Sequence, residues 1–572
     1  MSALCGILGK RDENAVRAMA AAMKHRGAAC HVLEGDAFIV AGSTPPGKGP
    51  CLVDGAVRDT EGTVLNPDAL RAHCIASNDA ARLRLQGAFA AVVCWDGGRR
   101  WWLMRDRLGV KPLYYCLVND TVVFASELKG LLASGLMAKH LNLASVDRYL
   151  TLRCVPGPET IFQGIRRVQP GHVLEYWDGK LSETLYNRVD LHVEPVKRKA
   201  AAERLRAALE RAVNRTAAEN VLWSAGMDCA ALAALKPGLK PLFVALRTAW
   251  QDEARLAKSA ARSMRLPLET RRGKPFDEET FLKAVYHLDE PIADPSVFPL
   301  WQILEQAGRV AGSFLTGHGA DELLGGYPRY HFLQKTRGAR RRMPAGLLMG
   351  IRPALPPNAF LRRGARYLSS GHDNLEGYMS LLSVFDHDER AELYTDAMKA
   401  AIHEKGGSLA VIQSHFCDVD LTRDLLSLDL NVGLPDLLLT ECERMAAAHG
   451  VELEFPYLDD DLVDFAVTLP ANVKFGARSK SLLRHAMKGI LPGRVRIRAR
   501  RGFRVPQGGQ AVRVIEAMAR QTITQERVEA SGLFKWPVVE QVVRSATHNV
   551  YRRRQFWALL MFFAWHRAYM ET

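Results

Sequence analysis

The first third of the chain carries short apolar runs that are separated by glycine and proline turns. This pattern is typical of antiparallel β-strands. The clearest runs are 31–42, 87–96 and 100–107. A charged segment with apolar residues at helical spacing follows at 194–216 and predicts an amphipathic helix. We therefore expect a strand-rich first domain over residues 1–190 and a second domain over residues 200–572.

In the second domain, apolar runs alternate with segments of helical periodicity. The runs are 221–223, 241–246 and 313–317. Such alternation predicts a parallel sheet whose ligand-binding loops lie at its carboxyl edge. From about residue 330 onward the pattern is mostly helical, and the proline- and arginine-rich piece 337–366 is expected to be irregular. The predicted fold class combines α/β with α+β and includes a large helical part.

A turn of small residues follows the first of these runs. Its positions are Ser224, Ala225, Gly226, Met227, Asp228 and Cys229. A strand that ends in small residues before a helix lets backbone N–H groups surround phosphate oxygens, and the helix dipole favours the anion. Asp228 then lies where a carboxylate can hold the Mg²⁺ that accompanies pyrophosphate. Taken alone, the hexapeptide would be interpreted as an ordinary strand-to-helix turn.

A second glycine-rich turn follows the run 313–317 and strengthens this interpretation. It contains Gly317, His318 and Gly319, and Asp321 comes two residues later. Because both turns follow strands of the predicted sheet, Asp228 and Asp321 can clamp one metal-bound pyrophosphate between them. The neighbouring Glu322 is the weaker metal candidate.

Composition indicates a globular protein with room for two or more domains. The chain has 572 residues, of which 48% are hydrophobic and 24% charged. It contains no run of 18 uncharged apolar residues that would predict a membrane span, and no signal-peptide core follows its start. The ten cysteines lack CxxC or zinc-like spacing, which indicates reduced thiols and a cytoplasmic location.

The net charge of +15 comes largely from arginine-rich runs. These runs are 337–342, 493–504 and 551–554. Such runs usually form solvated basic faces, and their functional interpretation is attraction of a polyanion such as ATP or an acidic peptide. No nucleic-acid-binding signature accompanies them, so nucleic acid is the least favoured partner.

Eight longer blocks carry a resemblance that extends over most of the chain. They are 105–115, 124–132, 156–172, 289–300, 316–327, 452–466, 479–492 and 498–506. In this order and spacing the chain resembles the asparagine synthetase family. The resemblance implies an Ntn-hydrolase-like glutaminase domain, built as an antiparallel β-sandwich with helices, followed by an ATP-pyrophosphatase synthetase domain. It also implies ATP and Mg²⁺ as cofactors and an AMP-forming carbon–nitrogen ligase activity that releases pyrophosphate.

The first domain departs most from this family. In its glutamine-dependent members, a cysteine next to the initiator methionine uses its own freed amino group as a base. Here the matching motif begins at Cys5, behind four residues, and the family's HRGPD reads HRGAAC at 25–30. Asp54 replaces the asparagine of the oxyanion hole, where its charge would repel an oxyanion. We therefore expect a vestigial glutaminase domain, with Cys5 as its relic.

Without glutamine hydrolysis, the nucleophile must be free ammonia or an amine that arrives with the substrate. In β-lactam synthetases and lasso peptide cyclases, which are branches of this family, an amine of the same molecule attacks the adenylated carboxylate. The leading interpretation is an amide-forming ligase of this branch, acting on a small molecule or peptide, with macrolactam closure as the first choice. A precursor peptide or a biosynthetic protein is then the expected partner.

Two alternatives stay open. One is asparagine synthetase-like amidation that uses ammonia or glutamine. The other is an inactive relative that acts as a binding protein, because Ala225 and Cys229 replace a glycine and a serine of the family's pyrophosphate loop.

Two further positions bear on the chemistry. His318 occupies the variable site of its turn, where β-lactam-forming relatives place a base; it either deprotonates the attacking amine or only hydrogen-bonds within the turn. Arg500 matches the lysine with which the family's active-site loop stabilises the adenylation transition state, and Arg498 or Arg501 could serve instead. Glu454 stands where relatives carry arginine, and the sequence offers no physical reason for this reversal.

Overall fold

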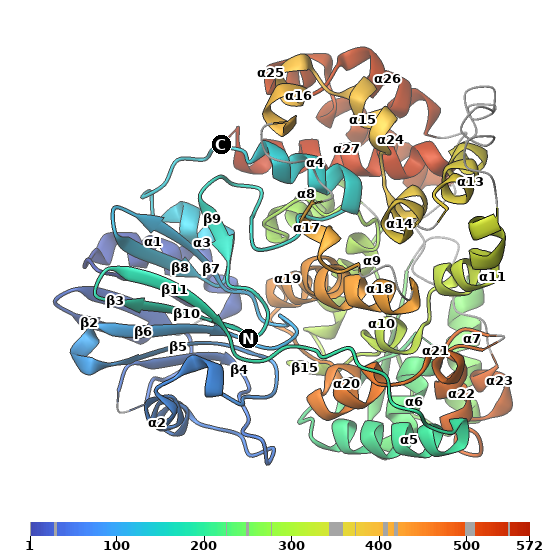
Figure 1. Cartoon of the computed structure of the whole chain (residues 1–572), viewed down its shortest axis with the longest axis horizontal. Coiled ribbons are helices and arrows are strands. Elements are labelled where there is room, and N and C mark those ends of the chain that lie inside the picture. The colour runs from blue at the N-terminus through green and yellow to red at the C-terminus, as the bar shows by residue number, and fades with distance from the viewer. Residues whose placement is uncertain are drawn as a thin grey trace.

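The structure is a computed structural model of the chain. It describes residues 2–27, 31–47, 49–224, 226–246, 251–275, 277–342, 359–371, 373–403, 410–416, 421–476, 478–497, 509–546 and 550–571. Two antiparallel sheets occupy the N-terminal part, and a parallel sheet surrounded by helices occupies the rest (Figure 1).

The two antiparallel sheets pack face to face. The first has the order β2 (His31–Gly35), β3 (Phe38–Gly42), β1 (Leu4–Leu8), β8 (Thr121–Ala125), β7 (Tyr114–Val118) and β9 (Ile165–Arg167). The second has the order β11 (Lys180–Leu185), β10 (His172–Trp177), β6 (Arg100–Arg105), β5 (Phe89–Trp95) and β4 (Cys51–Gly55). Side chains such as Leu4, Leu8, Val92 and Leu103 alternate inward to form the core between them.

Helices cover the outer faces of this sandwich. Helices α1 (Glu13–Ala22) and α3 (Leu128–Ala133) pack on the first sheet, and α2 (Pro67–Ser77) packs on the second. The antiparallel β-sandwich with flanking helices that the sequence predicts is therefore confirmed.

The third sheet is entirely parallel. Its order is β14 (Glu269–Arg272), β13 (Lys240–Ala245), β12 (Asn220–Leu222), β15 (Ser313–Leu315) and β16 (Glu452–Glu454). Phe243 and Leu315 face a core built with α5 (Arg198–Asn214), α6 (Met227–Leu235) and α7 (Gln251–Ser263). Leu242 and Phe314 face the opposite way, toward α8 (Glu278–His287), α9 (Val297–Ala307) and α19 (Thr440–Ala448). The sheet is thus buried on both faces, as parallel sheets are.

A long C-terminal helix completes the helical part. In α27 (Val550–Tyr569), the apolar residues from Phe556 to Trp565 are all buried. Helices α8 and α26 (Trp536–Ser545) pack against it, and it runs across the upper part of the helical region in Figure 1, below α26. Among the residues that the structure describes, no helix is long and apolar enough to cross a membrane.

The prediction that residues 337–366 are irregular is wrong for the described parts of that segment. Helix α11 (Pro328–Arg342) continues through its beginning, and α13 (Ala359–Ser369) covers its end. Arginine is a good helix former, and these arginines find partners. Arg340, fully buried, donates to the side-chain oxygen of Asn374, and Arg363 donates to the backbone oxygen of Val384.

Candidate active site

Both glycine-rich turns lie at the carboxyl ends of neighbouring strands. Strand β12 ends at Leu222, and α6 begins at Met227 with Gly226 as its N-cap. Strand β15 ends at Leu315, and α10 (Ala320–Leu324) begins after Gly319. Val221 pairs with Leu315 across the two strands, so the turns leave the same edge of the sheet side by side.

The two turns approach each other so closely that glycine is required. A Cβ added at Gly317 would lie 2.8 Å from the Cβ of Asp228. Gly319 has φ +89°, and a Cβ there would lie 2.4 Å from the side chain of Leu458. The glycines therefore bring the second turn onto the first turn of α6.

Asp228 and Asp321 come together on one cation, the ammonium group of Lys480. The Lys480 Nζ lies 2.6 Å from Asp228 Oδ2 and 2.7 Å from Asp321 Oδ1. The lysine side chain is 5% exposed, while the two aspartates keep 24% and 19% of their side-chain surface exposed. Burial alone would lower the pKa of Lys480, but the two carboxylates more than offset burial and raise it.

This arrangement fits a magnesium ion that carries phosphate oxygens. Two carboxylates from two loops already converge on a positive charge, and both stay partly open to solvent. Asp228 and Asp321 would hold the ion, which when bound would neutralise the charge of pyrophosphate. Lys480 was not singled out from the sequence. It lies within the block 479–492 that carries the family resemblance, and this block was the only signal for it.

The pyrophosphate turn is braced from inside by Cys229. Its thiol is buried, accepts from the Ser224 N–H at 3.5 Å, and donates to the Gly226 oxygen at 3.3 Å. Ser224 is exposed, and Met227 is buried in the core beneath α6. Cys229 thus shapes the turn, whereas Ser224 and the Gly226 backbone are on its accessible side.

Glu322 points away from the two aspartates into the protein interior. It is 3% exposed and accepts a hydrogen bond from the Tyr327 hydroxyl. Burial, with a smaller contribution from the charge of Asp321, raises the pKa of Glu322 to about 7. The structure therefore places only Asp321 of this acidic pair toward the site.

His318 lies in the turn between β15 and α10, where its Nδ1 is hydrogen-bonded to the Thr316 hydroxyl at 2.5 Å. It is partly buried, and its Nδ1 contact holds the ring against the end of the strand. The remaining sequence candidates, Ala225 and Arg500, lie outside the described residues, as do Arg498 and Arg501.

Glu454, which stands where the relatives carry arginine, binds backbone N–H groups of the chain. Its carboxylate oxygens accept from the backbone N–H groups of Ala217 and Ala218, at 3.1 and 2.8 Å. These residues lead into β12, so Glu454 anchors the chain just before the strand that ends in the pyrophosphate turn. An arginine at this position would have no acceptor to offer these donors.

Cys5 lies within the N-terminal sandwich. It is 2% exposed and lies in β1, between Ala41 of the neighbouring strand β3 and Ala125 of the neighbouring strand β8. Its neighbours in the core are apolar side chains of the first sheet and of α1. The strand thus presents this thiol to a packed interior.

Asp54, which replaces the oxyanion-hole asparagine, is held as an anion. It is fully buried, accepts from the Ser2 hydroxyl at 2.7 Å, and pairs with Arg26 at 2.9 Å and Lys111 at 3.6 Å. Burial alone would raise the pKa of Asp54, but Lys111 and Arg26 outweigh burial and lower it. Asp54 therefore carries the negative charge that the sequence predicts at this position.

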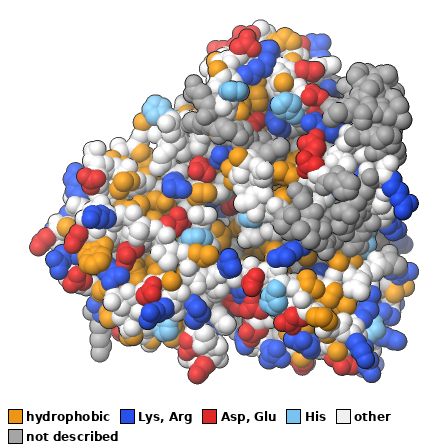
Figure 2. Space-filling view, in the orientation of Figure 1, with side chains coloured by type: hydrophobic (Ala, Val, Ile, Leu, Met, Phe, Trp, Pro, Cys, Tyr) orange, Lys and Arg blue, Asp and Glu red, His pale blue; other side chains and the backbone are white. Residues whose placement is uncertain are grey.

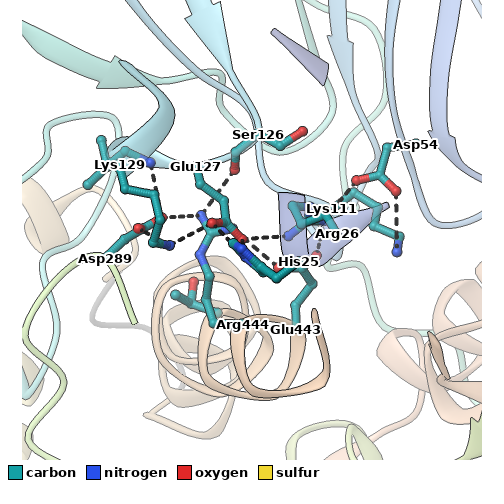
Figure 3. Close-up of polar contacts among 12 residues, drawn as sticks. His25, Arg26, Asp54, Lys111, Ser126, Glu127, Lys129, Asp289, Glu443 and Arg444 are labelled. Carbon is teal, nitrogen blue, oxygen red and sulfur yellow. Dashed lines mark hydrogen bonds and ion pairs between the residues drawn. The ribbon is translucent and has the colours of Figure 1, made fainter. Parts of the chain in front are cut away.

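Asp54 belongs to a buried ionic cluster that joins the sandwich to the helical part (Figure 3). Arg26 also pairs with Glu127 at 3.0 Å and with Glu443 of α19. The other members, paired in the same way, are His25, Lys111, Lys129, Asp289, Arg444 and Glu452. Charges of both signs therefore lie at the contact between the two parts of the molecule, beside the start of β1.

The outer surface shows a different distribution of charge. On the face in Figure 2, Lys and Arg side chains of the described residues are interspersed with Asp and Glu. The excess of 15 positive charges over the whole chain is thus not gathered into one stripe on that face.

Two glycine-rich loops that present carboxylates at the carboxyl edge of a parallel sheet define a nucleotide-processing α/β domain, here joined to an antiparallel sandwich. The family model "Asparagine synthase" matches residues 200–567, and the model "Glutamine amidotransferase domain" matches residues 70–187. The chain belongs to the asparagine synthase family and is an ATP-dependent carbon–nitrogen ligase of the AMP-forming type.

Individual relatives agree with this placement. The chain is 26% identical to "Asparagine synthetase [glutamine-hydrolyzing] 1" of Bacillus subtilis, an alignment that covers 86% of this chain and 79% of the relative. It is 25% identical to "Asparagine synthetase [glutamine-hydrolyzing] 3" of the same organism, over 71% and 65% of the two chains. It is also 22% identical to "Amidase chyE" of Penicillium rubens, over 81% and 76%.

Proposed function

We propose that this ligase adenylates a substrate carboxylate with ATP, releases pyrophosphate, and passes the acyl group to an amine that arrives with the substrate. The observation that carries the proposal is the meeting of Asp228 and Asp321, from two loops, on a single positive charge. A carboxylate pair in this arrangement suits a metal-bound pyrophosphate leaving group.

The chain's own residues divide the remaining work. Lys480 and the N-terminal backbone of α6 supply positive charge for the phosphates. His318 lies in the second glycine-rich turn, hydrogen-bonded to Thr316, and is proposed as the base that takes the proton from the attacking amine. Arg500 is proposed to stabilise the charge that develops at the α-phosphorus.

The N-terminal half supports an amine source other than glutamine. Cys5 lies in a packed interior, and an ionic cluster that contains Asp54 and Arg26 lies at the contact with the synthetase half. We therefore propose that residues 1–190 form a structural domain beside a synthetase domain of residues 200–572. Closure of a peptide macrolactam, as in lasso peptides, is our first choice of reaction, with a cytoplasmic location and a precursor peptide as partner.

The two chemical steps are separated by measuring AMP and amide product in single turnovers with a candidate peptide. His318→Ala should still form AMP but lose amide, because the adenylate forms and then hydrolyses. Arg500→Ala should lose both products, because no charge meets the developing phosphorane. Equal loss of AMP and amide in His318→Ala would remove the base assignment. Amide formation only with added ammonia would favour asparagine synthetase-like amidation, and absence of AMP with every carboxylate would favour a binding protein.

A further inference from the structure

Lys480 occupies the position between the two aspartates that a divalent cation would take. Its ammonium is within hydrogen-bond distance of both carboxylates, at 2.6 and 2.7 Å. We propose that, in the nucleotide-free protein, Lys480 stands in for the metal and keeps free divalent cations out of the empty site. This inference rests on the proposed function of Asp228 and Asp321.

The Lys480 side chain is buried beneath the two aspartates. Lys480 precedes α22 (Ser481–Ala486) in a left-handed conformation, φ 51°, and its side chain is 5% exposed. Room for it depends on Gly326, where a Cβ would lie 2.5 Å from Lys480 Cε and 1.6 Å from Asp321 Oδ1. With its stem confined in this way, the ammonium cannot withdraw into open solvent when a second cation arrives.

The charge balance then decides what can bind. Two carboxylates and one ammonium sum to −1, so Mg²⁺ alone would change the site to +1 and would lie next to another cation. Like charges this close repel each other strongly at the effective dielectric of a protein surface. A metal that arrives with pyrophosphate oxygens brings negative charge with it, and the ammonium can transfer its hydrogen bonds to those oxygens.

The consequence is an order of binding. The metal enters as a complex with the nucleotide or with pyrophosphate, and Lys480 changes partner from carboxylate to phosphate at that moment. Lys480 is thus a positioning residue that couples occupation of the metal site to the presence of phosphate. A purely structural lysine would stabilise the two loops but would not compete with metal.

The chain offers a matched control in Lys474. This lysine is 1% exposed, and its Nζ has no hydrogen-bond partner among the described residues. Burial alone lowers its pKa to about 7. Lys474→Met removes a buried lysine nearby in the chain without touching the aspartates.

The test measures the affinity of the full-length protein for Mn²⁺, with electron paramagnetic resonance as the readout. Neither nucleotide nor carboxylate substrate is present. Lys480→Met should bind Mn²⁺ at least tenfold more tightly than wild type, and Lys480→Met with Asp228→Asn should lose that gain. Lys474→Met should bind as wild type does. With pyrophosphate present, the order should reverse, because Lys480→Met lacks the charge that holds the phosphate.

The proposal is overturned if folded Lys480→Met binds Mn²⁺ no more tightly than wild type in the absence of pyrophosphate. Lys480→Gln is the second variant, in case the methionine variant does not fold, and circular dichroism checks both. Because no substrate is present, these results stand apart from the proposed ligase reaction. If the protein formed no AMP but Lys480 still competed with Mn²⁺ for the two aspartates, the proposed reaction would be refuted. The competition between lysine and metal would still stand.

Discussion

The two halves of the molecule use buried charge in opposite ways. At the contact between the halves, Arg26 touches Asp54, Glu127 and Glu443, and every one of these side chains is at most 5% exposed. At the edge of the parallel sheet, Lys480 touches two aspartates that remain about a fifth exposed. The first set is closed to solvent, whereas the second leaves its two carboxylates partly open to it.

This difference separates a structural cluster from a reactive one. A fully buried ionic network is costly to open, because each charge left without a partner keeps its desolvation penalty. The two aspartates at the sheet edge are partly exposed, and we propose that their lysine changes partner to phosphate when the nucleotide binds. Under the function proposed above, the glutaminase-like half is a fixed support, and the chemistry is confined to the synthetase half.

The largest effect is expected at the two aspartates. Asp228→Asn or Asp321→Asn should lower AMP formation by roughly a thousandfold, because a metal offsets several kcal/mol of phosphate charge in the transition state. Both side chains keep about a fifth of their surface exposed, so the fold should survive. The check is the rate of substrate-dependent AMP release. Near-normal release by either variant would refute the clamp.

Arg26→Met tests the closed cluster. It should destabilise the protein by about 3–5 kcal/mol, because Asp54, Glu127 and Glu443 would lose a shared buried cation. Adding Asp54→Asn should restore part of the loss. Thermal unfolding provides the measurement, and Arg11→Met provides the control. Arg11 pairs with Glu34 at the surface, where such pairs contribute at most about 1 kcal/mol. Equal effects of Arg26→Met and Arg11→Met would contradict the structural role.

A smaller effect concerns pH. Burial lowers the pKa of His287 to about 3 and that of His449 to about 4, and the two rings flank Trp301. Each stays neutral in the folded protein but binds a proton when unfolded below pH 6.5 or so. Their contribution to stability is therefore complete above that pH and is lost as pH falls, by roughly 2 kcal/mol each at pH 5.

The pH effect is measured as the difference in unfolding midpoint between pH 7.5 and pH 5. His287→Phe should show a smaller difference than wild type. An unchanged difference would mean that the buried ring does not remain neutral in the folded protein, and that other groups control acid sensitivity.

The sequence predicted the architecture because the relevant signals are local. Short apolar runs indicated the strands of the first domain, and the family resemblance implied their sandwich. Strand-to-helix alternation indicated the parallel sheet with its two glycine turns. The order of strands β14 and β16 at its edges was not predictable, since their short, partly polar sequences lack a strand pattern. The helices α11 and α13 were missed because their arginines are satisfied by distant partners such as Asn374.

The candidate site was predictable only in part. The aspartates follow motifs, but Lys480 enters the site from a segment far along the chain, and its left-handed backbone directs it there. Glu454 likewise gains its meaning only from Ala217 and Ala218, which fold back beside it. Contacts of this kind depend on tertiary structure and leave no periodic trace in the sequence.

The most direct test of the contrast between the halves is glutamate release from glutamine, measured with AMP and amide formation in wild type and Cys5→Ala. The buried thiol and the closed cluster around Asp54 predict no glutamate above background in either protein. They also predict identical AMP and amide yields. Glutamate release by wild type that disappears in Cys5→Ala would contradict the central claim, because the N-terminal half would then be a working glutaminase.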